Sequence, residues 1–289
     1  MKKHTKILII FCLIRLSLLL YPAFSNLWNE SRSTKSIDTY VEQVNSIDEE
    51  EYERMWQEAV DYNSDLAKKN ECYVLDEKNK KRYLSCLNPG GYGIMGYIDI
   101  PSLGVSLPIY HSTEEKVLQV AAGHIEWSSL PVGGENTHCV ISGHRGLPNA
   151  KLFTDLDKMR ENDIFTLTVF DEVLTYEVDQ IRTVLPQEVD ELKITKGEDY
   201  CTLVTCTPYG INSHRLLVRG HRIESEPKYI SVISEAVIID QLVVAFFLAL
   251  PIFIILFLIV MLKKPEKRKT ASKKRTHNNN SINTFHYRS

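Results

Sequence analysis

The sequence predicts a mainly β domain, a barrel or a sandwich, with helices on its N-terminal side. From Gly96 onward, short runs of β-branched and aliphatic residues alternate with turn residues, a pattern that argues against a doubly wound sheet. Gly133-Gly134 lacks the lysine and the spacing of a phosphate-binding loop. The expected strands are Tyr97–Ile100, Val105–Tyr110, Cys139–Ser142, Ile164–Val169, Leu174–Ile181, Cys201–Thr205 and Leu216–Ile223, with helical patches around Thr113–Val120 and Leu152–Met159.

Two amphipathic helices are expected before the strands, within residues 25–70. Apolar residues keep helical spacing from Ile37 to Ile47 and again from Tyr52 to Leu66. Ser46 or Asp48 can cap the second helix, because either side chain accepts a hydrogen bond from a backbone N–H group. We expect this stalk to pack on the flank of the β domain rather than to contact a substrate.

Residues 71–93 are expected to form a loop. The stretch is charged and ends in Asn88-Pro89-Gly90-Gly91, a cluster of turn-forming residues.

The first apolar segment, Ile7–Leu20, is interrupted only by Arg15 and follows three lysines. This pattern indicates a signal anchor or a signal peptide over residues 1–24, and the arginine favours a retained anchor over a cleaved peptide.

A second apolar segment predicts a transmembrane helix over residues 237–262. Gln241–Leu262 contains no charged residue, and about 20 apolar residues suffice to span a bilayer. The tail at 263–289 is strongly basic, and short basic flanks stay on the cytoplasmic side. Both termini are therefore expected in the cytoplasm, with residues from about 25 to 236 outside the cell.

Charge argues against a nucleic-acid ligand for the exported part. Of the 34 Lys and Arg residues, 13 lie before residue 25 or after residue 262, whereas 35 of the 37 Asp and Glu residues lie within residues 25–236, the exceptions being Asp240 and Glu266. The middle of the chain therefore carries a formal charge of about −14, which suits lysine-bearing partners or serves solubility. The basic tail adjoins a membrane segment and is read as a membrane flank.

The candidate chemistry is centred on Cys206 and Arg215. Cys206 ends one expected strand and Arg215 begins the next, with a Pro/Gly/Asn-containing loop between them. If the strands form a hairpin, the guanidinium stands beside the thiol and favours its nucleophilic thiolate form. A cysteine nucleophile also needs a proton donor and acceptor, usually histidine. His144 follows an expected strand in a glycine-flanked turn, although His214 and His221 lie nearer to Cys206 in sequence.

The remaining cysteines carry no expected metal site, because no Cys/His spacing resembles one, and no cofactor is expected. Cys139 and Cys201 lie in apolar runs and are expected to be inert buried thiols.

Several motifs resemble the sortases, the cysteine transpeptidases of Gram-positive cell surfaces. Thr202-Leu-Val-Thr-Cys206, with Arg215 nine residues later, resembles the family signature, and Ser142-Gly-His144-Arg resembles its histidine motif. The fuller text Gly123-His-Ile-Glu-Trp-Ser-Ser-Leu-Pro-Val-Gly-Gly134 and a second, C-terminal span are similar to class C, the pilus-polymerising group.

The resemblance implies a closed β-barrel over residues 94–236 and a catalytic trio of His144, Cys206 and Arg215. Cys206 would attack the Thr–Gly bond of an LPXTG-type sorting signal and form a thioester. A lysine amine of the next pilin subunit would then resolve the thioester into an isopeptide bond. Thr205 and Thr207, which flank the nucleophile, are candidates for substrate binding, and Thr205 is equally well explained as an ordinary strand residue.

One departure from class C concerns the segment that covers the cysteine. The usual Asp-Pro-aromatic triplet is missing, and a stretch bracketed by Cys72 and Cys86 stands in its place. The site is therefore open or carries a different lid. Outside the cell a disulfide between these cysteines can persist, and closing a loop of about 15 residues would stabilise the fold by about 3 kcal/mol.

Three alternatives stay open at this stage. A sortase that attaches proteins to peptidoglycan would use the same residues, but the second span and the class C motifs argue against it. A hydrolytic cysteine protease would use water as the acceptor. A non-catalytic membrane scaffold for pilus assembly is the alternative of another class, and the joint presence of His144, Cys206 and Arg215 argues against it.

Overall fold

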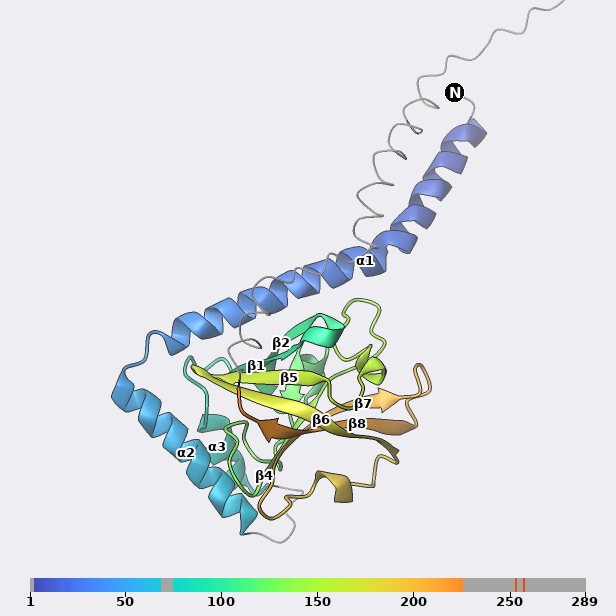
Figure 1. Cartoon of the computed structure of the whole chain (residues 1–289). Coiled ribbons are helices and arrows are strands. Elements are labelled where there is room, and N and C mark those ends of the chain that lie inside the picture. Colours follow the sequence, from blue (N-terminus) through green and yellow to red (C-terminus); the bar gives the residue numbers. More distant parts are fainter. Residues whose placement is uncertain (1–2, 69–74, 226–252, 254–256, 258–289) are drawn as a thin grey trace, which may run out of the picture.

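The computed structural model describes residues 3–68, 75–225, 253 and 257, with backbone alone for residues 3–10 and 13. Three helices precede a closed barrel with the strand order β1-β2-β3-β4-β7-β8-β6-β5 (Figure 1). The strands are β1 Ile94–Ile100, β2 Val105–His111, β3 Ala122–His124, β4 Thr137–Ser142, β5 Ile164–Val169, β6 Glu172–Val184, β7 Asp199–Thr207 and β8 His214–Ile223.

All seven expected strands lie in or overlap observed strands, and the fold is a barrel rather than a sandwich. The sequence missed β3, because three residues are too few to show an alternating pattern. This short strand pairs in parallel with β2 and antiparallel with β4. It therefore joins two parts of the barrel that would otherwise be unpaired.

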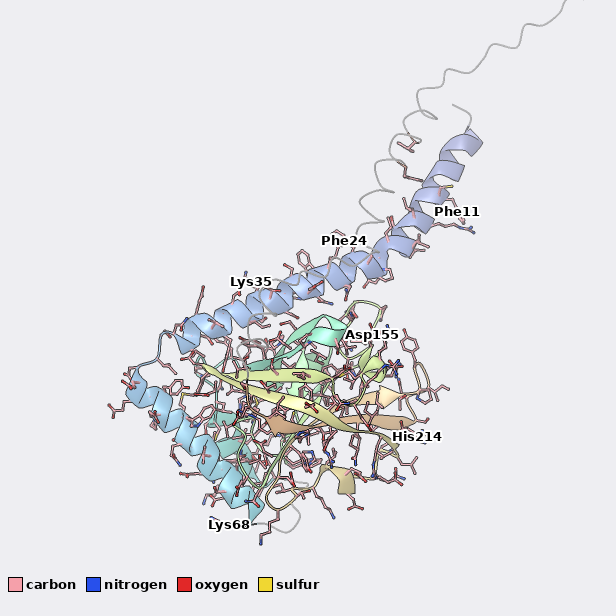
Figure 2. The ribbon with its side chains drawn as sticks, in the orientation of Figure 1. Phe11, Phe24, Lys35, Lys68, Asp155 and His214 are labelled. Carbon is pink, nitrogen blue, oxygen red and sulfur yellow. The ribbon has the colours of Figure 1, made fainter. Side chains whose placement is uncertain are left out.

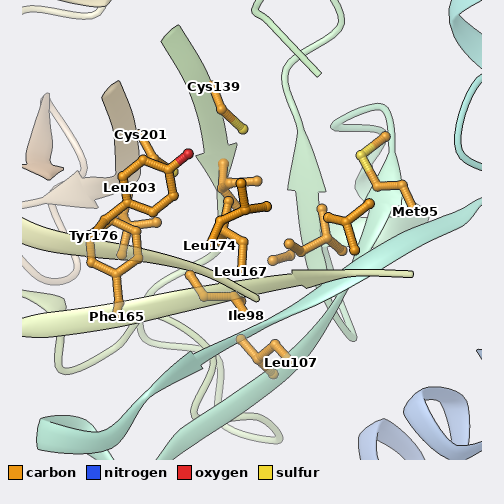
Figure 3. Packing of buried hydrophobic residues seen from close by; sticks show 14 of the residues in the cluster. Met95, Ile98, Leu107, Cys139, Phe165, Leu167, Leu174, Tyr176, Cys201 and Leu203 are labelled. Carbon is orange, nitrogen blue, oxygen red and sulfur yellow. The ribbon is translucent and has the colours of Figure 1, made fainter. Parts of the chain in front are cut away.

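The barrel interior is packed with aliphatic and aromatic side chains (Figure 3). Phe165 and Tyr176 stack with their ring centroids 5.5 Å apart, on the paired strands β5 and β6. Cys139 and Cys201 occupy registered positions on β4 and β7 and are 2% and 0% exposed. Burial keeps both thiols away from solvent, and their inertness stays a prediction.

Two helices cover one side of the barrel, as the stalk interpretation expected. Helix α1, Lys3–Val44, runs along the barrel and beyond it, and α2, Glu49–Ala67, turns back across its flank (Figures 1 and 2). Asp48 is the N-cap of α2 and accepts a hydrogen bond from the Glu51 backbone N–H at 2.8 Å. That contact settles which of the two candidate caps is used.

Tyr40 joins α1 to the barrel. Its side chain is fully buried, its hydroxyl donates to the Met95 carbonyl at 3.1 Å, and it accepts from the Phe170 N–H at 2.8 Å. Burial raises the pKa of Tyr40, so the hydroxyl keeps its proton and can serve as both donor and acceptor.

Two local expectations were wrong. The stretch read as a loop contains helix α3, Glu77–Ser85, which Asp76 caps by accepting from the Asn79 N–H at 2.7 Å. Its sequence is strongly charged and carries a single buried residue, Tyr83, so it shows too little apolar periodicity to be recognised. The helical patch at Leu152–Met159 is reduced to a 3₁₀ turn, η2, Leu156–Lys158.

The structure does not test the two predicted membrane segments or the predicted disulfide between Cys72 and Cys86. In the part of the chain that the structure describes, no helix is both long and apolar enough for a membrane span. Most of Gln241–Leu262, with Cys72 and the tail, lies outside the described residues. Cys86 carries a free thiol that is 1% exposed, and burial raises its pKa to about 11.

Replacing Tyr40 by phenylalanine tests the attachment of α1. The change leaves the Phe170 N–H and the Met95 carbonyl without their buried partner, so Tyr40→Phe is expected to lower the free energy of unfolding by about 1–3 kcal/mol. Chemical denaturation followed by near-UV circular dichroism measures it. Tyr92→Phe, at a tyrosine that is 70% exposed, is the matched control. Equal unfolding midpoints for the two variants would contradict the assignment.

Candidate active site

Cys206 and Arg215 face each other across two antiparallel strands. The register of β7 and β8 pairs Cys206 with Arg215 directly, at the end of the hairpin where β7 finishes and β8 begins. Directly opposed residues in such a pair have Cβ atoms about 4.5–5.5 Å apart and point to the same face of the sheet. The hairpin expected from the sequence therefore forms, and it places Arg215 on the strand directly opposite the half-buried Cys206.

His144 reaches the same place from β4. Strand β4 runs parallel to β7 with Ser142 opposite Val204, and the Gly143 N–H extends the pairing by donating to the Val204 carbonyl at 3.0 Å. Continuing this register by two residues brings His144 level with Cys206. By this register, the three residues that the sequence singled out stand at the same end of three neighbouring strands, and their catalytic roles stay predictions.

The loop that carries His144 is fixed by backbone contacts. Thr205 is 2% exposed, and its hydroxyl donates to the Gly143 carbonyl at 2.8 Å. The Phe153 N–H donates to the His144 carbonyl at 3.1 Å. A Cβ atom at Gly143 would lie 2.6 Å from the Phe153 ring, so only glycine fits. The Thr205 hydroxyl points into the protein and holds the histidine loop, while substrate contact through it stays a prediction.

The Arg215 guanidinium is held from one side. Its Nη1 donates to the carbonyls of Asn212 and His214 at 3.3 and 3.1 Å. Arginine has five N–H donors, and within the described residues these two bonds leave Nε and Nη2 available to oxygen atoms of a substrate. A permanently charged, partly free guanidinium on the residue opposite a thiol is suited to binding a carbonyl oxygen or an oxyanion.

Arg145 is a site residue that the sequence reasoning missed. Its side chain is 9% exposed, pairs with Asp157 and donates from Nη1 to the Thr207 hydroxyl at 3.4 Å. Its guanidinium carbon also lies 5.8 Å from the centre of the Tyr209 ring. Arg145 therefore ties the histidine loop to the chain that follows the nucleophile. The only hint in the sequence was that Arg145 directly follows the candidate catalytic residue His144.

The other histidines are mostly structural. The ring nitrogens of His111 bind the carbonyls of Gly93 and Cys86, and burial lowers its pKa. His138 binds the Lys193 carbonyl and the Thr202 hydroxyl, and burial lowers its pKa to about 4. His124 is fully buried against Tyr83 and Ser129. Among the described residues no cluster of three or more His, Cys, Asp and Glu could hold a metal.

A half-buried thiol, an opposed guanidinium and a histidine at the rim of a closed β-barrel define a cysteine-dependent enzyme of the sortase type. Residues 98–223 match the sortase domain model. The structure is similar to sortase C1 from Streptococcus agalactiae, with 47% identity, a TM-score of 0.65, and coverage of 66% of this chain and 100% of that one. The chain belongs to the sortase family.

Two further solved structures are similar over the same share of this chain. Streptococcus pneumoniae sortase C is 46% identical with a TM-score of 0.58, and 97% of that chain is covered. Clostridium perfringens sortase C, solved with the C-terminal cell wall sorting motif, is 43% identical with a TM-score of 0.59, and all of that chain is covered. A curated sortase A from S. agalactiae is 32% identical over 117 residues, which span 39% of this chain and 47% of that relative's length.

Arg145→Ala is expected to lower the free energy of unfolding by about 1–3 kcal/mol, because it removes charge-assisted contacts of a nearly buried guanidinium. It should also speed amide hydrogen exchange at Tyr209, whose ring loses its cation. Arg182→Ala is the matched control: it removes an arginine whose side chain is 52% exposed, and exposed ion pairs contribute about 0–1 kcal/mol. Equal effects of the two substitutions would refute the bridging role.

Proposed function

We propose that this chain is a class C sortase, a membrane-anchored transpeptidase that joins pilin subunits. The observation that carries the proposal is the cross-strand pair of Cys206 and Arg215, with His144 at the extension of the neighbouring strand. Similarity to three class C sortases at 43–47% identity supports the class. The name of the S. pneumoniae structure refers to pilin substrate specificity, which supports a pilin as the partner.

The first half of the reaction makes a thioester. The Cys206 thiolate attacks the threonine carbonyl of an LPXTG-type sorting signal, and the charge that develops on the carbonyl oxygen is stabilised by the Arg215 guanidinium. His144 gives its proton to the departing glycine amine, because an amine leaves only when protonated. The thiolate thus acts on the carbonyl carbon, the guanidinium on the carbonyl oxygen and the imidazole on the amide nitrogen.

The second half resolves the thioester with an amine. A lysine of the next pilin loses a proton to His144 and attacks the thioester carbonyl, which releases the Cys206 thiolate and forms an isopeptide bond. No cofactor enters either step, since proton transfer and charge stabilisation come from side chains. The acidic exported region, with a charge of about −14, favours the approach of lysine-bearing partners.

An apolar cluster supports binding of the leucine and proline of such a signal. Val140, Val204 and Leu217 lie on β4, β7 and β8, and the partly buried Ile125 and Trp127 pack against them. Val204 is two residues before Cys206 on the same strand, so both point to the outer face of the barrel. The three strand residues are themselves buried, so an extended peptide that reaches the thiol would meet the partly buried Ile125 and Trp127 that pack against them.

We propose that the catalytic domain faces the outside of the cell, with both termini cytoplasmic. The apolar segment Ile7–Leu20 and the uncharged segment Gln241–Leu262, each with a basic flank, support two membrane anchors. Attachment of proteins to peptidoglycan is the second candidate function, because it differs only in the acceptor amine.

Cys206→Ala is expected to abolish polymer formation, because the thioester needs the thiol. Co-expression with candidate pilins that carry a C-terminal sorting signal, followed by denaturing electrophoresis, should give a ladder of covalent polymers with the unchanged enzyme and monomers with the variant. Mutation of the acceptor lysine should also remove the ladder. Pilin linked to peptidoglycan fragments would favour the second candidate function, and a ladder that persists with Cys206→Ala would favour a non-catalytic scaffold.

Arg215→Lys keeps the charge at the hairpin end but removes the planar fork. We expect kcat for cleavage of a sorting-signal peptide to fall by about 10²–10³, the usual loss when an oxyanion donor is removed. A peptide-cleavage assay with and without added amine measures this and also separates transfer from hydrolysis. Arg182→Lys controls for a general loss of charge or stability. Retention of full kcat by Arg215→Lys would show that a point charge suffices.

A further inference from the structure

His144 has a carboxylate partner that lies far from it in sequence. The His144 Nε2 atom is 3.2 Å from Oε2 of Glu115, 29 residues earlier in the chain. The histidine side chain is 27% exposed and the glutamate side chain 70% exposed. The contact is therefore at the rim of the barrel, on the solvent side of the proposed catalytic group.

Glu115 lies near His144 because three neighbouring strands are paired. Glu115 begins helix α4, Glu115–Leu118, which follows β2, and β2 is paired with β3, which is paired with β4. The Leu118 side chain packs over Gly123 of β3, where a Cβ atom would lie 3.1 Å from it. The helix therefore stands beside the end of β4, from which the His144 loop emerges.

Both oxygens of the Glu115 carboxylate are engaged. Oε1 accepts from Nε2 of Gln119 at 2.5 Å, one helical turn later, and Oε2 faces His144. The hydrogen bond from Gln119, followed by the contact with His144, lowers the pKa of Glu115, so the carboxylate is ionised at neutral pH. Gln119 orients the carboxylate before any substrate is bound.

We propose that Glu115 is a positioning residue for the transpeptidation of the proposed function. It binds Nε2 of the His144 ring, so that Nδ1 is the atom that exchanges a proton with Cys206. An ionised carboxylate accepts but cannot donate, so it requires a proton on Nε2. In the neutral ring the lone pair then resides on Nδ1. The arrangement has the order nucleophile, base and orienting carboxylate that is seen in other nucleophilic enzymes.

The proton balance follows from this assignment. Nδ1 takes the proton of the Cys206 thiol, which gives a thiolate and an imidazolium whose Nε2–H stays bonded to Glu115. Nδ1–H then passes its proton to the leaving amine, and the neutral Nε2–H tautomer is restored. In the second half Nδ1 takes a proton from the incoming amine and returns it to the thiolate of Cys206. Glu115 touches no reacting atom and exchanges no proton.

The neighbouring glutamate supplies a matched control. Glu114 precedes Glu115 directly, and it pairs with Lys116 at 2.7 Å instead of with the histidine. Glu114→Ala removes the same charge from the same rim without touching the His144 ring. A difference between the two variants therefore reports the contact and not the surface potential.

The test uses the full chain in detergent with ¹⁵N-labelled histidine, and His144→Gln identifies the His144 resonances. Long-range ¹H–¹⁵N spectra of the neutral ring should show the Nε2–H tautomer in the unchanged protein and in Glu114→Ala, and a mixture of tautomers in Glu115→Ala. In a sorting-peptide assay, Glu115→Ala should lower kcat about two- to fivefold with KM unchanged, the size expected for an exposed contact. Glu115→Gln, whose amide oxygen still accepts, should restore most of kcat.

Two results would overturn the proposal: an unchanged tautomer in Glu115→Ala, or a loss of activity confined to KM. The spectroscopic measurement needs no turnover, so it tests the contact even if the peptide is not the substrate. Cleavage that disappears with Cys206→Ala while the tautomer is insensitive to Glu115 would leave the proposed function intact and reject the positioning role. Absence of cleavage by the unchanged protein would count against the proposed function alone.

Discussion

The candidate site depends on the pairing of β7 with two different neighbours. On one side β7 is parallel to β4, and on the other it is antiparallel to β8. The antiparallel side sets Cys206 opposite Arg215, and the parallel side sets His144 level with Cys206. A slip of either register by one residue would turn a side chain to the opposite face, because residues alternate along a strand. The buried side chains of the barrel interior therefore fix the chemistry at its rim, since they fix the registers.

The strand ends are then held by side-chain contacts that span the rim. Thr205, inside the barrel wall, binds the backbone before His144, and Arg145, just after it, reaches Thr207 beyond the nucleophile. Each of these contacts joins the β4 end to the β7 end from a different side. The cysteine and the histidine are on separate strand ends, and these contacts hold the two ends together. They explain how His144, which lies in a loop, can keep the fixed geometry that proton transfer requires.

The sequence predicted the strands well and singled out a candidate catalytic trio, because both leave local signals. Alternating apolar residues mark strands, and Cys206, Arg215 and His144 each stand at the edge of such a run. The closed barrel was implied by the resemblance to sortases. The apolar periodicity alone was compatible with either a barrel or a sandwich. β3 and α3 were missed, since one is too short and the other too charged to show a period. Glu115 was missed for another reason: its contact with His144 exists only through the pairing of β2, β3 and β4.

The three candidate catalytic residues all stand at the rim of the barrel, and the loop after His144 is also tied to α1. The Lys151 N–H donates to the Asn26 side chain at 2.8 Å, and the Asn29 amide donates to the Asn149 carbonyl at 2.5 Å. Asn26 follows the proposed anchor segment by less than two helical turns. If that segment is embedded, the His144 loop is held close to the membrane surface, because the helix between them is continuous. Under the proposed function, a sorting signal presented at that surface would reach Cys206 close to the membrane, and α1 would both anchor the barrel and support the His144 loop.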